Sequence, residues 1–351
     1  MRIGVVIPCF KVRSHVLDVI GAIGPEVDRI YAVDDCCPVR SGDLIEQAVS
    51  DPRVTVLRHS VNKGVGGAVV TGYRAALNDE LDIVVKVDGD GQMDPALIPL
   101  FISPIVAGEA DYAKGNRFFS STAIKNMPWL RLIGNAALSF MTKLSSGYWS
   151  VFDPTNGYTA IHTRTLNALD LDSLSERYFF ETDVLIRLSD LRAVVIDVPM
   201  RAVYGDEVSG LKISKVLGEF IGKHVKATLR RIVYSYLLRD FNIASANFLI
   251  GMTFLLFGTV FGILGWLNSL TTGVPATTGT VMLSVLPLIV GIQMLLFFFG
   301  YDIAAEPKRP VQRQTVLATL DPDGRLRRQQ QPTEEKTIRS GSDDADASKV
   351  N

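Results

Sequence analysis

The sequence predicts an α/β fold with a mostly parallel sheet, followed by two helices that cross a membrane as a hairpin. Two observations carry this prediction. In the first half of the chain, short runs rich in valine and isoleucine alternate with segments of helical periodicity, as in parallel sheets that are covered on both faces. Towards the C-terminus, two stretches without charged residues are each long enough to cross a hydrocarbon core of about 30 Å, which takes about 20 residues.

The predicted strands are apolar with little alternation, and each is followed by a polar or glycine-rich segment. The strands span 2–10, 29–35, 53–59 and 82–88, and the helices lie near 13–24, 41–50 and 67–79. The segments after the strands begin at Pro8, Asp34, Asn62 and Asp88. Ligands of parallel sheets bind beyond the carboxyl ends of the strands, so these segments are expected to form one site.

The two uncharged stretches run from Ile243 to Leu267 and from Thr280 to Phe299. Both are apolar on every face, which favours membrane spans over two buried helices of a globular domain. Lysine and arginine are frequent before the first stretch and recur after the second, whereas the link at 268–279 has neither. By the positive-inside rule, both flanks are expected in the cytoplasm and the link on the other side of the membrane.

The chain is therefore expected to have five parts. They are a cytoplasmic α/β domain at 1–210, a basic amphipathic segment at 211–240, membrane helices at 243–267 and 280–300, and a disordered tail at 306–351. The basic segment interleaves apolar residues at helical spacing with lysines, so it either lies on the anionic inner leaflet or packs on the soluble domain as a solvated helix. The tail is rich in Gln, Asp and Ser and has almost no apolar cluster, which is typical of disorder.

Composition narrows the classes of function. The 36 basic and 37 acidic residues nearly balance, which gives no global case for binding nucleic acid. The three cysteines, Cys9, Cys36 and Cys37, form no CxxC pair and have no histidine cluster nearby, so we expect reduced thiols and no zinc site. The opening MRIGVVIPCF is too short an apolar run for a signal peptide and is interpreted as the first strand.

Carboxylates gather directly after the fourth predicted strand, at Asp88, Asp90 and Asp94. Side chains at i and i+2 of a strand point to the same face, so Asp88 and Asp90 can reach one ion, with Gln92 as a further candidate ligand. Such hard oxygen ligands suit Mg²⁺ or Mn²⁺, which share their shell with ligand phosphates. The alternatives are a cationic group of a ligand, or an acidic turn that faces only water.

A glycine-rich turn, NKGVGGAVVTGYRAAL at 62–77, leads into a predicted helix. Backbone N–H groups at such a helix N-terminus can accept a phosphate. The segment lacks the GxxxxGK[ST] pattern of a P-loop and the GxGxxG spacing of a dinucleotide fold. Phosphate binding and a merely tight strand-to-helix turn both remain open.

The order of these motifs resembles family 2 glycosyltransferases and, more narrowly, polyprenyl-phosphate glycosyltransferases of the dolichol-phosphate mannose synthase type. The resemblance covers roughly residues 3–210 and the hairpin. It rests on VVIPCF at the start, VDD at 33–35, NKGVGGA at 62–68, DGDGQMDP at 88–95, GNRF at 115–118, DPTNGY at 153–158 and FETD at 180–183.

The resemblance implies a GT-A fold and a nucleotide-diphosphate sugar as donor, bound with Mg²⁺ or Mn²⁺. Matched donor positions are Pro8, Asp35, Lys63, Gly64, Asp88 and Gln92, and matched metal positions are Asp88, Asp90 and Gln92. Matched catalytic positions are Asp90, Asp153, Glu181 and Asp183, of which the last three line the acceptor side. Positions expected to hold the acceptor phosphate are Arg117, Arg201 and Ser209; Arg201, Glu207 and Ser209 belong to the loop that closes over the site.

The chain departs from the family pattern near the expected nucleotide base. The usual P-x-Y-N-E opening is Pro8-Cys9-Phe10-Lys11-Val12, DDGS is Asp34-Asp35-Cys36-Cys37, and Thr159 replaces a frequent arginine. The choice between a UDP-sugar and a GDP-sugar therefore stays open.

The implied function is inverting transfer of a sugar to a polyprenyl phosphate at the cytoplasmic face of the cell (inner or plasma) membrane. A lipid monophosphate is already ionised near pH 7, so it mainly needs positioning rather than a general base. The segment at 125–144 either dips into the membrane interface and leads the lipid in, or is an ordinary packing helix. The sequence leaves the sugar, the polyprenyl chain and homo-oligomerisation open.

Two other functions are less favoured. A processive polysaccharide synthase would carry a Q-x-x-R-W motif and more membrane spans, and this sequence has neither. A non-catalytic membrane scaffold that keeps the fold as a nucleotide-sensing module is disfavoured because the metal carboxylates are present.

Overall fold

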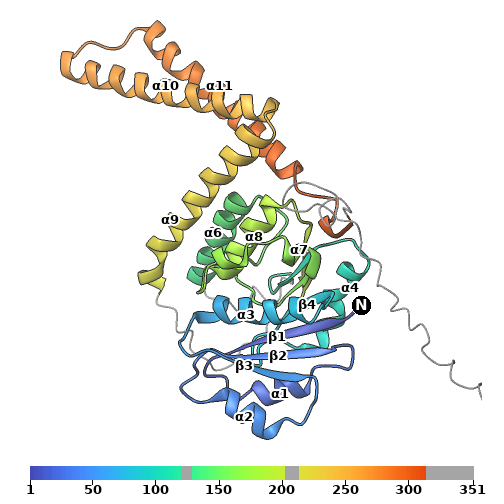
Figure 1. The fold of residues 1–351 in the computed structure, drawn as a ribbon. Helices are drawn as coiled ribbons and strands as arrows, with labels where there is room; N and C mark the ends of the chain where they lie inside the picture. The colour runs from blue at the N-terminus through green and yellow to red at the C-terminus, as the bar shows by residue number, and fades with distance from the viewer. Residues whose placement is uncertain (120–128, 202–212, 314–351) are drawn as a thin grey trace, which may run out of the picture. The chain divides into compact units, whose positions relative to one another are not determined.

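The computed structural model describes residues 1–119, 129–201 and 213–313. In these ranges the first part of the chain forms a seven-stranded sheet of order β3-β2-β1-β4-β6-β5-β7 (Figure 1). The strands are β1 (Ile3–Cys9), β2 (Arg29–Asp34), β3 (Val54–Arg58), β4 (Ile83–Lys86), β5 (Tyr112–Asn116), β6 (Thr159–His162) and β7 (Val195–Pro199). The predicted mostly parallel α/β sheet is confirmed, with β6 inserted antiparallel between β4 and β5.

Helices connect the strands and cover both faces of the sheet. Those of the sheet domain are α1 (Val16–Gly21), α2 (Ser41–Ala48), α3 (Gly64–Asn78), η1 (Pro95–Leu97), α4 (Ile98–Val106), α6 (Trp129–Ser146), α7 (Thr163–Asn167), η2 (Leu171–Ser173) and α8 (Phe180–Asp190). The later ones are α9 (Ile213–Ile232), the π-helix η3 (Val233–Arg239), α10 (Ile243–Thr272), α11 (Thr278–Ala304) and η4 (Val311–Arg313). The predicted boundary at residue 210 lies outside the described residues.

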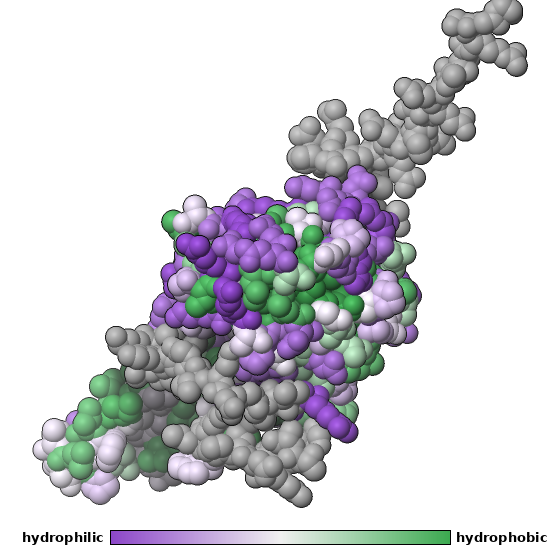
Figure 2. All heavy atoms as spheres, turned by 90° about the horizontal axis from the view of Figure 1, so that it is seen from below, coloured by the Kyte–Doolittle hydropathy of each residue, from purple (hydrophilic) through white to green (hydrophobic). Residues whose placement is uncertain are grey.

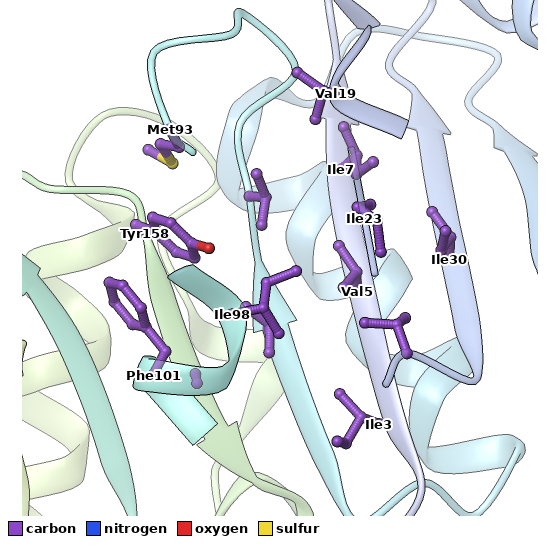
Figure 3. Packing of buried hydrophobic residues seen from close by; sticks show 14 of the residues in the cluster. Ile3, Val5, Ile7, Val19, Ile23, Ile30, Met93, Ile98, Phe101 and Tyr158 are labelled. Carbon is purple, nitrogen blue, oxygen red and sulfur yellow. The ribbon is translucent and has the colours of Figure 1, made fainter. Parts of the chain in front are cut away.

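The sheet is buried on both sides, as its apolar strands require. Val5 and Ile7 of β1 pack into one cluster with α1, whereas Val6 between them packs into the other cluster with α3. In the first cluster the rings of Phe101 and Tyr158 stack at a centroid distance of 3.9 Å (Figure 3). Each fully buried aliphatic or aromatic side chain contributes about 1.5–3 kcal/mol, so these two layers hold the strand ends in place.

The face of the sheet domain near α1 and α2 is largely polar. Figure 2 shows the face near α1 and α2, where hydrophilic residues surround a smaller group of hydrophobic ones. The hairpin of α10 and α11 differs, because most of its large apolar side chains are exposed. By length and composition both helices can cross a membrane.

Small residues line the seam between α10 and α11. A Cβ atom built on Gly258 would lie 2.8 Å from the carbonyl oxygen of Ser284, and one built on Gly291 would lie 2.9 Å from the carbonyl oxygen of Gly251. The Ser284 hydroxyl donates to the Gly258 carbonyl at 3.0 Å. Close backbone approach through small residues is the usual way in which membrane helices pack.

A cluster of polar side chains joins the hairpin to the sheet domain, with Arg231, Tyr236 and Asp302 buried and Trp149 half-buried. We call these four residues the hairpin joint. The guanidinium of Arg231 donates to both carboxylate oxygens of Asp302, at 2.7 and 2.9 Å. The Trp149 indole donates to the same carboxylate at 2.9 Å, and so does the Tyr236 hydroxyl. The joint therefore connects the loop after α6, the end of α9, η3 and the last turn of α11.

The prediction of a disordered tail from Glu306 is wrong for residues 306–313. The backbone N–H groups of Val311 and Gln312 donate to the buried carboxylate of Asp111, each at 2.8 Å, and the Glu306 carboxylate accepts from the Ser150 N–H at 2.7 Å. Backbone polar groups bind a buried charge here, which composition does not reveal. Residues 314–351 lie outside the described residues.

Helix α9 shows features of both alternatives for the basic segment. On one side it packs against α6, where His224 and Arg231 are buried. On another side Ile221, Val225 and Leu229 are exposed at helical spacing. Its position on a membrane surface stays a prediction.

Candidate functional site

The carboxyl end of β4 places a buried lysine beneath the acidic turn. Lys86, the last residue of β4, is 1% exposed. Its ammonium lies 2.8 Å from Asp88 Oδ1 and 3.1 Å from Glu181 Oε1. Burial alone would lower the pKa of Lys86, but the charges of Asp88 and Glu181 outweigh it and raise this pKa above its usual value. The two carboxylates therefore favour the protonated, cationic form of Lys86.

The two carboxylates after β4 differ in their hydrogen bonding. Asp90 accepts a hydrogen bond from the Gln92 backbone N–H at 3.0 Å, and Asp88 Oδ1 has the Lys86 ion pair but no hydrogen bond of good geometry. In the described part of the chain, no three His, Cys, Asp or Glu side chains are grouped to hold a metal. A divalent ion would thus use Asp88 and Asp90 and fill its shell from a diphosphate and water, which suits Mg²⁺.

Asp94, the third carboxylate of the turn, has a structural role. Its side chain accepts from the Ala96 N–H at 3.0 Å and caps η1, and its carbonyl accepts from the Tyr158 hydroxyl at 3.0 Å. Gly157, the neighbour of Tyr158, packs against the turn. A Cβ atom built there would lie 2.4 Å from the Lys86 ammonium and 2.5 Å from Asp88 Oδ2, so only glycine fits without a shift.

The two acidic residues of FETD are used differently. Glu181 faces Lys86, whereas Asp183 accepts from the Ser175 N–H and hydroxyl at 2.8 and 3.0 Å. Asp183 also pairs with Arg187 at 3.3 Å. Residues two apart on a helix point in different directions, so only Glu181 joins the cluster at the end of β4.

Arg117 and Asp153 form a second charged pair. The guanidinium of Arg117 donates to both oxygens of the fully buried Asp153 carboxylate, at 2.7 and 3.0 Å, and to the Thr155 hydroxyl at 3.2 Å. The Arg117 side chain remains 28% exposed. A planar, doubly hydrogen-bonded guanidinium is oriented for a phosphate or carboxylate.

An apolar pocket lies beside this pair. It is lined by Phe118, Leu132, Asn135, Ala136, Leu138, Phe152, Asp153, Pro154 and Thr155. Four of these residues belong to α6, the helix within the segment predicted to meet the lipid. Trp129, Ile133 and Phe140 of α6 are exposed, while Ser139 and Thr142 are buried, so α6 packs on the domain and also presents apolar side chains.

Hydrogen bonds to other parts of the protein hold the glycine-rich turn in place. The buried carboxylate of Asp35 accepts from the backbone N–H groups of Lys63 and Gly64 at 2.8 and 2.7 Å and contacts the His59 ring at 2.7 Å. At the start of α3, the N–H groups of Gly66 and Gly67 donate to the carbonyl of Glu176 at 2.8 and 3.2 Å. A Cβ atom on Gly66 would lie 2.3 Å from a neighbouring carbonyl. This geometry favours the tight-turn interpretation.

The remaining predicted residues are only partly placed. Pro8 lies in β1 opposite Val33 at the carboxyl edge, and Arg201 is exposed just beyond β7. Glu207 and Ser209 lie outside the described residues. Donor binding by Pro8, Asp35, Lys63 and Gly64 and acceptor binding by Arg201 stay predictions.

Sequence reasoning missed three residues: Lys86, Lys114 and Gly157. Lys114 of β5 is fully buried and donates to the Asn156 carbonyl. Burial lowers the pKa of Lys114 to about 8, although the charges of Glu181 and Asp153 oppose this shift. The two lysines could have been identified from the sequence, because a lysine inside an apolar strand is almost never fully buried unless it is paired.

Comparisons with known proteins agree with the motifs. The family described as glycosyl transferase family 2 matches residues 4–169. The chain is 30% identical over 230 residues to an undecaprenyl-phosphate mannosyltransferase of Micrococcus luteus, covering 64% of this chain and 91% of that relative. It is 29% identical over 202 residues to a polyprenol monophosphomannose synthase of Mycolicibacterium smegmatis, covering 56% and 75% of the two chains.

A solved structure is also similar. It is glucosyl-3-phosphoglycerate synthase from Mycobacterium tuberculosis in complex with Mn²⁺, UDP and glucosyl-3-phosphoglycerate, at 20% identity and a TM-score of 0.48, covering 66% of this chain and 79% of that one.

Proposed function

This chain belongs to glycosyl transferase family 2, and we propose that it transfers a sugar from a nucleotide-diphosphate sugar to a polyprenyl phosphate. It is a glycosyltransferase, and its mixed, mostly parallel sheet has the GT-A-type fold. The observation that carries the acceptor proposal is the apolar pocket beside Arg117, which pairs a phosphate-binding group with a surface for a hydrocarbon chain. Two of the relatives are named for the same class of lipid acceptor.

The donor is proposed to bind at Asp88 and Asp90 with Mg²⁺ or Mn²⁺. When bound, the metal would neutralise charge on the departing nucleotide diphosphate. The chain supplies the two carboxylates, while the Gln92 N–H holds Asp90 in place.

The acceptor is proposed to bind at Arg117. Asp153 fixes the guanidinium with two hydrogen bonds, and the exposed part of Arg117 can hold an anionic head group. An ionised phosphate attacks without losing a proton, so the site needs orientation more than a base. This agrees with the contacts of the two acidic residues, because Glu181 forms an ion pair with Lys86 and Asp183 accepts hydrogen bonds from Ser175.

The lipid chain is proposed to run from the pocket along α6 towards the hairpin. Aromatic contacts continue in that direction: Phe140 packs edge-on to Trp149 at 6.3 Å, and Trp149 packs edge-on to Phe299 of α11 at 6.4 Å. These side chains present apolar surface between the reaction site and the membrane helices.

We propose that both flanks of the hairpin lie on the cytoplasmic side. Helix α9 before the hairpin and residues 306–313 after it both contact the sheet domain, which supports placing them on one side of the bilayer. A single cysteine at Val274, in a background with Cys9, Cys36 and Cys37 replaced by serine, tests this. An impermeant reagent should label it in intact cells; labelling only after lysis would reverse the topology.

The function is tested by incubating purified protein with Mg²⁺, a panel of labelled UDP- and GDP-sugars, and polyprenyl phosphate. The expected product is a lipid-linked sugar phosphate that mild acid cleaves, and Arg117→Ala should raise the KM for the lipid. Asp90→Asn is the inactive control. Transfer to a free sugar or a protein, with polyprenyl phosphate inert, would contradict the proposal.

A further inference from the structure

We propose that Lys86 is a specificity-determining residue of the metal site: its positive charge keeps Asp88 and Asp90 from capturing a divalent ion that arrives without a nucleotide. This inference rests on the proposed function only in taking Asp88 and Asp90 as the metal ligands.

The geometry places one cation between two carboxylates. The Lys86 ammonium lies 2.8 Å from Asp88 and 3.1 Å from Glu181, in a position that is 1% exposed. The side chains of Asp88 and Glu181 are 27% and 12% exposed, so water screens these charges only in part. Taken with Asp90, the four groups carry a net charge of about −2 at neutral pH.

Stability does not explain a lysine at this position. The other residues of β4 are Ile83, Val84 and Val85, all buried. Replacing a buried ion pair by well-packed apolar residues is often neutral or stabilising. A charge at the last position of β4, in contact with a predicted metal ligand, therefore points to a role in the site.

Without Lys86, Asp88 and Glu181 would face each other as two uncompensated carboxylates, and with Asp90 the local charge would be about −3. The more negative local charge would then attract free Mg²⁺ or Mn²⁺ more strongly to Asp88 and Asp90, whether or not a diphosphate is present. With Lys86 present, the carboxylates bind the ion weakly on their own and depend on the negative charge of the diphosphate. Lys86 thereby makes the metal and the nucleotide bind together.

Four proteins separate the effect of charge from that of packing. Lys86→Met keeps the length and apolar stem of the side chain and gives a local charge of about −3, and Glu181→Gln gives about −1. The double variant Lys86→Met/Glu181→Gln returns to about −2, the wild-type value, without the ion pair.

The measurement is binding of Mn²⁺ alone to each full-length protein, followed by the electron paramagnetic resonance signal of free Mn²⁺, with no nucleotide or lipid. We expect Lys86→Met to bind Mn²⁺ about tenfold more tightly than wild type, Glu181→Gln to bind it less tightly, and the double variant to resemble wild type. Adding Asp90→Asn to Lys86→Met should abolish the tight binding, which locates it at this site.

Equal or weaker Mn²⁺ binding by Lys86→Met would overturn the proposal, and so would a double variant that behaves like Lys86→Met. Thermal unfolding of the four proteins identifies any variant that does not fold. If Lys86→Met does not fold, the Mn²⁺ affinity of the double variant is compared with that of Glu181→Gln, and the double variant should bind Mn²⁺ more tightly. Failure of the lipid-acceptor proposal would appear only in the product assay, because no substrate is present here.

Discussion

The cluster around Lys86 and the hairpin joint both bury a cation against carboxylate, but they balance charge differently. In the joint, the single carboxylate of Asp302 accepts four hydrogen bonds, two from Arg231 and one each from Tyr236 and Trp149. At the end of β4, one ammonium faces two carboxylates, and Asp88 remains partly exposed. A carboxylate whose oxygens all accept hydrogen bonds from the protein has a structural role. A partly exposed cluster with more carboxylates than cations can still bind a cationic ligand.

The largest effect is expected when one of the carboxylates at the end of β4 is neutralised. Asp88→Asn and Asp90→Asn should each lower turnover about a thousandfold, or about 4 kcal/mol, because they remove metal-binding charge, and EDTA should do the same. Asp94→Asn is the matched control: it lies in the same turn but caps η1, which asparagine also does, so it should remain near wild type. Full activity of Asp88→Asn, Asp90→Asn and the EDTA-treated enzyme would remove the metal assignment.

Breaking the joint should cost stability rather than metal binding. Asp302→Asn leaves Arg231 buried without a countercharge, so we expect a loss of about 3–5 kcal/mol, seen as a lower Tm in detergent. Arg230→Met is the control, because Arg230 pairs with Asp190 at the surface and should contribute about 1 kcal/mol or less. A Tm for Asp302→Asn that matches this control would show that the joint is not structural.

The packing of α9 against α6, where His224 contacts Ser145, should weaken in acid. Burial lowers the pKa of His224 to about 4 in the folded chain. Between pH 6.5 and about pH 4, the histidine is therefore protonated in the unfolded chain but neutral in the folded chain. Stability should therefore fall as pH decreases through this window, by up to about 3 kcal/mol. His224→Phe should remove this dependence in urea unfolding at pH 7 and pH 5, whereas replacing the exposed His15 by asparagine should not. An unchanged pH dependence in His224→Phe would exclude His224 as its source.

The smallest effect is expected from a single methyl group. In Gly157→Ala the new Cβ would lie too close to both Lys86 and Asp88 Oδ2, so the pair must shift, and we expect a loss of turnover of about tenfold. Gly134→Ala in α6 is the matched control, because a Cβ atom built on Gly134 would meet no other group within 4 Å. Equal turnover of Gly157→Ala and Gly134→Ala would show that the turn tolerates displacement.

The sequence predicted the parts of the fold that depend on local pattern. Strands of β-branched residues end where expected, so Asp88 and Asp90 could be placed at the carboxyl edge from the sequence alone. The last three strands, β5, β6 and β7, were not predicted; β6, for example, has four residues and pairs antiparallel with strands far away in the chain. Contacts between distant residues also escaped, such as Arg117 with Asp153 and Lys86 with Glu181, because spacing along the chain does not indicate them.

The contact between Asp111 and the end of the hairpin has a consequence for the order of biosynthesis. Asp111 is fully buried at the start of β5, and its carboxylate accepts from the backbone N–H groups of Val194, Val311 and Gln312 and from the Thr165 hydroxyl. Two of these four donors are translated only after both membrane helices. Until they arrive, the Asp111 carboxylate lacks two of these four donors and the segment that packs on it, so the domain lacks part of its stabilising contacts. A nascent chain can therefore complete its catalytic domain only after the hairpin has left the ribosome, so folding of the domain follows synthesis of its membrane anchor.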